Sequence, residues 1–164
     1  MTQSAFTHKG NGVLSQLITD VTISSGNNRE TVSGLWDTGA SGTCIALSVV
    51  DKLGISPIQK IEQQTPAGKR IAGVYIVDIV LPNNVQFANH VVCDAELDEQ
   101  GIQMLVGMDI ISSGTLTVST FKGRTFFSFV HPSSQHVDYV YQLSIKKITD
   151  KGHMKKKKIA LCDM

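Results

Sequence analysis

A carboxylate on a tight turn at the end of an apolar strand constrains this chain more than any other feature. Residues 30–36 have extended character and lead into the sequence Leu-Trp-Asp-Thr-Gly-Ala-Ser at residues 35–41. A carboxylate followed by a hydroxyl and then by a residue without a side chain can be held rigidly and approached closely by a substrate backbone. The turn is therefore a candidate site for chemistry. The alternative is a loop in which Asp37 and Ser41 only cap the turn.

Short strand patterns separated by turns fill most of the remaining chain. The 164 residues include 14 glycines but only 4 prolines, which favours a turn-rich, mainly β fold of one domain. A short helix is expected over residues 48–54, with Ser48 as N-cap and Gly54 as its end. Strands are expected over residues 12–23, 30–36, 43–47, 58–64, 71–81, 85–92, 115–121 and 125–130.

Two segments carry a resemblance to a known family. Residues 35–41 resemble the active-site signature of retropepsin-like aspartic proteases, and residues 103–111 resemble the apolar-apolar-glycine strand, followed by a short helix, that packs beside that turn. The resemblance spans about residues 12–130. It implies a closed, mostly antiparallel acid-protease β-barrel with one or two short helices, a flap hairpin and a homodimeric assembly. Gly107 is expected to permit close backbone packing.

The resemblance also implies a reaction. Aspartic proteases hydrolyse peptide bonds with a water that one carboxylate activates while a second, protonated carboxyl polarises the peptide carbonyl. The chain has one Asp-Thr-Gly sequence and no room for a second lobe. A homodimer with Asp37 of each copy at the two-fold axis supplies the pair. The expected enzyme is an aspartic endopeptidase acting on polypeptides, with one active site per dimer.

The other turn residues have roles that the resemblance implies. Thr38 is similar to the threonine that bonds across the two-fold axis to the partner's turn, and Gly39 leaves room for water and substrate. Ala40 stands where pepsin-like enzymes have a serine or threonine that donates to the catalytic carboxylate. Because this donor is missing, we expect an activity optimum at mildly rather than strongly acidic pH.

A second hairpin occupies the position of the family's flap, the segment that closes over substrate. The expected tip runs from residue 65 to residue 70, with Thr65, Ala67 and Gly68 as residues that bind substrate. Lys69 and Arg70 at this tip suggest a preference for acidic substrate residues. On local sequence alone, an ordinary hairpin loop is the alternative.

The chain departs from retroviral members of the family at one place. Those members commonly have an acidic residue soon after Asp-Thr-Gly-Ala and an arginine just after the later glycine, and the two form a salt bridge. This chain has Ser41-Gly42 and Met108 instead. Both partners are missing together, so no single buried charge is left over. The departure favours a cellular or bacterial relative.

Cysteines and histidines give no sign of a cofactor. Cys44, Cys93 and Cys162 are odd in number and widely spaced, and the histidines lack partners at metal-ligand spacing. Free thiols in a reducing compartment are the expected state. The N-terminal residues lack the basic region and apolar run of a secretory signal, and no segment is apolar enough to span a membrane. We therefore expect a cytoplasmic protein without metal, cofactor or membrane anchor.

The C-terminal part differs in charge from the rest of the chain. Residues 1–145 carry a net charge of −4, and residues 146–164 carry +5. We expect a protease domain over residues 1–132 and an extension over residues 133–164, with a strand at 139–145 and a lysine-rich tail. The tail lacks interleaved aromatic residues, which favours a solvated segment over a nucleic-acid site. The alternative function is a catalytically silent peptide-binding or dimerisation module with the same barrel.

Overall fold

The structure is a computed structural model that describes residues 2–65, 68–98, 101–133 and 136–146. The chain divides into two units, residues 1–133 and 134–164, and each is described by itself. The elements of the first unit are β1 (Ser4–Lys9), β2 (Ile18–Ser25), β3 (Asn28–Trp36), β4 (Cys44–Ala46), α1 (Leu47–Leu53), β5 (Gln59–Thr65), β6 (Gly68–Leu81), the 3₁₀ helix η1 (Pro82–Asn84), β7 (Val85–Ala95), β8 (Met104–Val106), α2 (Met108–Ile111), β9 (Thr115–Phe121) and β10 (Arg124–His131).

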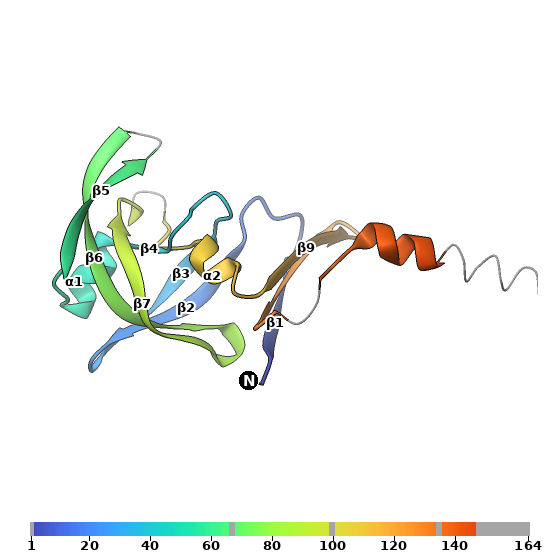
Figure 1. Cartoon of the computed structure of the whole chain (residues 1–164), viewed down its shortest axis with the longest axis horizontal. Coiled ribbons are helices and arrows are strands. Elements are labelled where there is room, and N and C mark those ends of the chain that lie inside the picture. Colours follow the sequence, from blue (N-terminus) through green and yellow to red (C-terminus); the bar gives the residue numbers. More distant parts are fainter. Residues whose placement is uncertain (1, 66–67, 99–100, 134–135, 147–164) are drawn as a thin grey trace, which may run out of the picture. The chain divides into compact units, whose positions relative to one another are not determined.

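A closed barrel forms the larger part of the first unit (Figure 1). Its strands follow the order β2-β3-β8-β4-β7-β6, and pairing of β2 with β6 closes the ring, while β5 extends from β6 as a hairpin arm. The β3–β8 and β4–β7 pairs are parallel, and the other pairs of this sheet are antiparallel. This confirms the expected mainly β, mostly antiparallel closed fold.

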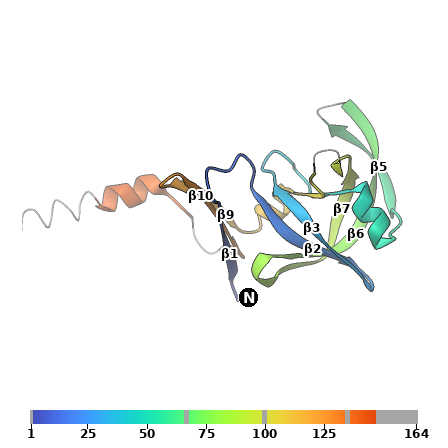
Figure 2. The same ribbon diagram turned by 180° about the vertical axis from the view of Figure 1, so that it is seen from behind.

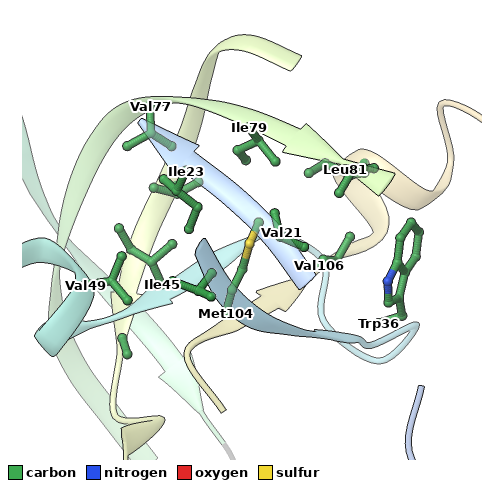
Figure 3. Packing of buried hydrophobic residues seen from close by; sticks show 14 of the residues in the cluster. Val21, Ile23, Trp36, Ile45, Val49, Val77, Ile79, Leu81, Met104 and Val106 are labelled. Carbon is green, nitrogen blue, oxygen red and sulfur yellow. The ribbon is translucent and has the colours of Figure 1, made fainter. Parts of the chain in front are cut away.

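Alternation of apolar and polar residues explains why the barrel closes. In β2, the side chains of Thr19, Val21 and Ile23 are buried while that of Asp20 is exposed, as expected for a strand with one face toward a core. Figure 3 shows the resulting interior, to which labelled side chains from β2, β3, β4, β6, β8 and α1 all contribute. Burial of this cluster is the main stabilising contribution to the fold.

The strands β1, β10 and β9 form a separate three-stranded sheet (Figure 2). Aromatic residues of this sheet pack against Trp36 at the end of β3. Phe127 and Phe129 are fully buried in the core, whereas Phe121 of the same hairpin is exposed. The ring centroid of Trp36 lies 4.9 Å from that of Phe129 and 5.5 Å from that of Phe6. These contacts anchor the residue that directly precedes Asp37.

The N-terminal strand was predicted in the wrong place. The sequence pattern predicts a strand over residues 12–23, whereas β1 lies upstream and β2 begins only at Ile18. Thr125 explains the difference. Its carbonyl accepts the Gly10 amide, its amide donates to the Gly12 carbonyl, and its hydroxyl accepts the Leu14 amide at 2.9 Å. The backbone groups of this segment are thus used in a loop that follows β1 and contacts β10, rather than in a strand ladder.

The start of α1 also differs from the expectation. Ser48 lies inside the helix, and the N-cap position is Ala46, which makes no side-chain capping bond. The carboxylate of Asp98 accepts hydrogen bonds from the Ser48 hydroxyl and amide instead. Gly54 ends the helix in the left-handed conformation with φ of 62°, as predicted.

The described part of the second unit is a helix over residues 139–146, where a strand was expected. Asp138 accounts for this, because its carboxylate accepts the Tyr141 amide at 3.0 Å and so caps the first turn. The lysine-rich tail lies outside the described residues. Among the helices that are described, none is long and apolar enough to cross a membrane.

Candidate active site

The Asp37 turn begins where β3 ends. The Asp37 amide donates to the carbonyl of Val106 in β8 at 3.0 Å, and the Ala40 amide donates to the Asp37 carbonyl at 3.2 Å. The Gly39 amide donates to Oδ1 of Asp37 at 2.8 Å. The side chain of Asp37 is half-buried, while Thr38 and Gly39 are exposed. The turn therefore holds one carboxylate in a fixed orientation and leaves its two central residues open to a ligand or a second chain.

Trp36 fixes the base of this turn. Its amide donates to the Leu17 carbonyl at 2.8 Å, and its indole Nε1 donates to the hydroxyl of Thr19 at 3.0 Å. Thr19 is buried and Leu17 is partly buried. Because the indole is satisfied and packed on several rings, the strand cannot rotate without breaking the core.

Gly107 brings the apolar strand β8 and the helix α2 against the turn, as expected. A Cβ at this position would lie 2.5 Å from the backbone carbon and oxygen of Gly42. The Met108 amide donates to the Ala40 carbonyl at 2.8 Å. Only a residue without a side chain allows this approach.

An acidic residue that the sequence analysis did not assign to the site holds the far end of the turn. The carboxylate of Asp109 accepts the Thr43 amide at 2.9 Å, the Thr43 hydroxyl at 2.7 Å and the Ile110 amide at 2.9 Å. Nε2 of His90 lies 3.0 Å from the same carboxylate, and the Gly107 amide donates to the Thr43 hydroxyl at 3.1 Å. We call this network the Asp109 clamp.

The clamp favours an ionised carboxylate. Burial alone would raise the pKa of Asp109, but the hydrogen bonds from the backbone and hydroxyl of Thr43, from His90 and from Ile110 outweigh it and hold the pKa below its ordinary value. The clamp connects the end of the turn to α2. The available sequence signal for the clamp was an acidic residue in the first turn of α2. The partners of that residue, Thr43 and His90, lie 66 and 19 residues away in the sequence.

The flap hairpin is formed by β5 and β6. Thr65 pairs with Gly68, and the Thr65 hydroxyl donates to the Gly68 carbonyl at 2.8 Å. Gly68 has φ of 123°, a conformation that favours glycine. Residues 68–70, which were expected in the tip, belong to β6, and Ala67 lies outside the described residues. In Figures 1 and 2, this hairpin and the loop after β3 that carries Asp37 project from the same end of the barrel.

The two basic residues near the tip are already paired. Lys69 forms an ion pair with Glu62 of β5 at 2.6 Å, and Arg70 pairs with the carboxylate of Asp94 in β7. Arg70 also donates to the Asp94 carbonyl at 2.9 Å. The structure thus gives a structural role to charges that were expected to select acidic substrates.

The partner of Arg70, Asp94, is buried in β7. Its carboxylate accepts the Gly73 amide at 2.7 Å and the Tyr75 hydroxyl at 3.2 Å. Burial and then the nearby Asp94 charge raise the pKa of Tyr75, so this phenol stays a donor. A Cβ at Gly73 would lie 2.7 Å from the same carboxylate, which keeps the position small.

Cys44 connects the turn to the flap. Nε2 of Gln63 in β5 donates to Sγ of Cys44 at 3.8 Å, and that thiol donates to the Gly42 carbonyl at 3.8 Å. Burial raises the pKa of Cys44 and also that of Cys93, its register partner in β7, so both remain protonated thiols. Within the described ranges, no three His, Cys, Asp or Glu side chains gather as a metal site.

The structure therefore brings the four predicted turn residues together, and it places Thr65 and Gly68 in the hairpin that faces the same end of the barrel. A family model described as aspartyl protease matches residues 19–110, and the chain belongs to this family. That match includes the turn, the flap hairpin and the glycine beside the turn.

Solved structures agree on the fold. The crystal structure of a retropepsin-like aspartic protease from Rickettsia conorii superimposes with a TM-score of 0.52 at 16% identity, covering 79% of this chain and 94% of that one. The fold is therefore retropepsin-like.

Two further structures are more distant. The simian foamy virus (mac) protease has a TM-score of 0.42 at 20% identity, covering 58% of this chain and 92% of that one. The retroviral protease-like domain of Ddi1 from Leishmania major has a TM-score of 0.45 at 14% identity, covering 70% and 94%. The comparison with curated proteins returned no match.

Proposed function

We propose that the protein is an aspartic endopeptidase whose active site forms when two copies bring their Asp37 carboxyl groups together. The observation that carries this proposal is the geometry of the turn, in which a half-buried carboxylate accepts the Gly39 amide while Thr38 and Gly39 stay exposed. Membership of the aspartyl protease family supports the reaction type. Residues 1–132 would form the protease domain and residues 133–164 an extension.

The chemistry requires the second copy. A single carboxylate cannot both take a proton from water and donate one to the scissile peptide. Two carboxyls about 3 Å apart share one proton, which is the known behaviour of aspartic protease pairs. Thr38 and Gly39 lie at the exposed top of the turn, where a two-fold axis would bring the second turn.

In the proposed reaction, an extended polypeptide lies between the turn and the flap hairpin. The ionised Asp37 takes a proton from water as the water attacks the peptide carbon, and the protonated Asp37 of the other copy donates to the carbonyl oxygen. The tetrahedral species collapses when a proton returns to the leaving amine. Thr65, Ala67 and Gly68 are the proposed flap residues, and their backbone groups would bind the substrate backbone.

Mixing wild-type protein with Asp37→Asn tests both the acid and the dimer. The variant should lose cleavage of an unfolded protein substrate at pH 4–6 but keep its oligomeric state in light scattering. After subunit exchange, adding an equal amount of the variant to a fixed amount of wild-type protein should halve the activity, since only about a quarter of the dimers then carry both carboxylates. Asp20→Asn, on an exposed position of β2, is the matched control.

Two outcomes contradict the proposal. Undiminished wild-type activity in the mixture would show that one copy is sufficient for a site. Peptide binding without cleavage by the wild-type protein would instead favour the catalytically silent module.

A further inference from the structure

A buried hydrogen-bond acceptor lies on the flap hairpin where it meets the end of the active-site turn. The side-chain Oε1 of Gln63 is buried and, among the residues that the structure describes, has no hydrogen-bond partner. The amide nitrogen of the same side chain contacts Cys44, whose thiol contacts the Gly42 carbonyl. Gln63 therefore lies on the face of β5 that is turned toward the segment following Asp37.

The orientation of the Gln63 amide follows from its neighbours. The Cys44 thiol donates its proton to the Gly42 carbonyl, so its sulfur can only accept from Gln63. Rotating the amide by 180° would place the oxygen against a sulfur whose proton is already used. The nitrogen thus faces Cys44, and the oxygen is the group left without a donor.

Buried acceptors without a donor are rare in folded proteins and often mark a functional site. Resting on the proposed protease function, we infer that Gln63 is a specificity-determining residue whose Oε1 accepts a hydrogen bond from a substrate side chain once the substrate displaces the groups that cover this oxygen. The substrate class is polypeptides with an uncharged donor, Asn, Gln, Ser or Thr, at the position bound beside Gln63.

The surroundings of Gln63 disfavour substrate side chains that carry a charge. Arg70 is the register partner of Gln63 across the hairpin, so both side chains lie on the same face. A substrate lysine or arginine would have to bury its charge beside a neutral acceptor, because the Asp94 carboxylate that could attract it is paired with Arg70. A substrate carboxylate would place its lone pairs against those of Oε1, and the positive charge that could attract it is paired with Asp94. A neutral donor meets neither obstacle.

The chain offers a matched pair of glutamines for the test. Gln64 is the next residue of β5, is exposed, and donates to the neighbouring Thr65 carbonyl at 3.3 Å. Gln63→Leu removes the acceptor at nearly constant volume, and Gln64→Leu makes the same change on the other face. Gln63→Glu keeps an oxygen acceptor and covers the case in which Gln63→Leu fails to fold.

Cleavage of a peptide library by the wild-type dimer, read by mass spectrometry, gives the preference at each substrate position. We expect one position at which Asn, Gln, Ser and Thr are favoured, with kcat/KM for an Asn peptide about 10–100-fold above that of its Leu counterpart. Gln63→Leu should abolish or reverse that ratio, while Gln64→Leu and Gln63→Glu should keep the preference for donors.

The outcomes separate this inference from the proposed function. Cleavage by the wild-type protein without any such preference, or an unchanged ratio in folded Gln63→Leu, overturns the role of Gln63 and leaves the protease intact. Absence of cleavage by the wild-type protein overturns both.

Discussion

Replacing Asp109 by asparagine should loosen the active-site turn and destabilise the protein. The carboxylate accepts the amide and hydroxyl of Thr43, the Ile110 amide and a contact from His90. Asparagine retains one oxygen acceptor. Its NH₂ group replaces the second carboxylate oxygen and would face a donor whose hydrogen bond that oxygen now accepts. The substitution thus keeps the shape of the Asp109 clamp and removes its charge and half of its acceptors.

The size of the effect follows from the geometry. A hydrogen bond to a charged group contributes about 1.5–3 kcal/mol, and a buried donor left unsatisfied costs about 1–3 kcal/mol. The Asp109 side chain is 28% exposed, so solvent screens the clamp only in part. We expect a loss of about 2–3 kcal/mol in the free energy of unfolding. For a unit of this size, that loss lowers Tm by roughly 6–15 °C.

The pH dependence of the loss has a definite sign. Because the folded-state pKa of Asp109 is held below its ordinary value of 3.8, the ionised clamp contributes its full stability above that value. The contribution disappears as the pH falls through the lower folded-state pKa. The difference in stability between wild-type protein and Asp109→Asn should therefore be constant near neutral pH and shrink at acidic pH below about 3.8.

Thermal unfolding followed by circular dichroism from pH 3 to pH 7 measures this difference. Asp20→Asn, which removes an exposed carboxylate from β2, provides the matched control and should change Tm by no more than about 1–2 °C. If Asp109→Asn and the control have equal Tm values at pH 7, or if the gap does not shrink at acidic pH, the charged clamp is refuted.

Three further substitutions test separate contacts. Gly107→Ala should destabilise by about 1–3 kcal/mol because its Cβ would lie 2.5 Å from the Gly42 backbone, whereas Gly12→Ala, with nothing within 4 Å, should be nearly neutral in the same urea titration. Asp94→Asn should lower the free energy of unfolding by about 3–5 kcal/mol, since it leaves a half-buried guanidinium uncompensated, and calorimetry measures this. Ala40→Ser should shift the acid limb of the pH–rate profile downward by about 0.7 unit, equivalent to about 1 kcal/mol, if its hydroxyl reaches the catalytic carboxylate.

Local patterns were sufficient to predict the strands of the barrel. The turn at Gly26 and the alternating run in β6 are signals that involve only residues a few positions apart. The structure has hairpins where these two signals predict them. The Asp37 turn and the close approach of Gly107 were also predictable, because a rare residue combination specifies each one.

Elements whose partners are remote in sequence were predicted less well. Residues 12–17 have a strand-like pattern, yet Thr125 uses their backbone groups in a loop, and no local signal reports a contact over more than 100 residues. The apolar run at 139–145 is compatible with strand or helix, and the capping bond of Asp138 favours the helix. In both cases, a side-chain hydrogen bond decides between two patterns of similar propensity.

The same distinction applies within the site and explains which residues the sequence did not reveal. Asp37 was identifiable because its role depends on the turn that contains it. Asp109, Asp94 and Gln63 resemble ordinary surface residues in the sequence, and each acquires its role only when the barrel brings a distant strand beside it. A polar side chain that is buried by tertiary contacts must find a partner, and the two aspartates have theirs within the chain. Gln63 has a partner there for its amide nitrogen, and the substrate is the proposed donor to its buried oxygen.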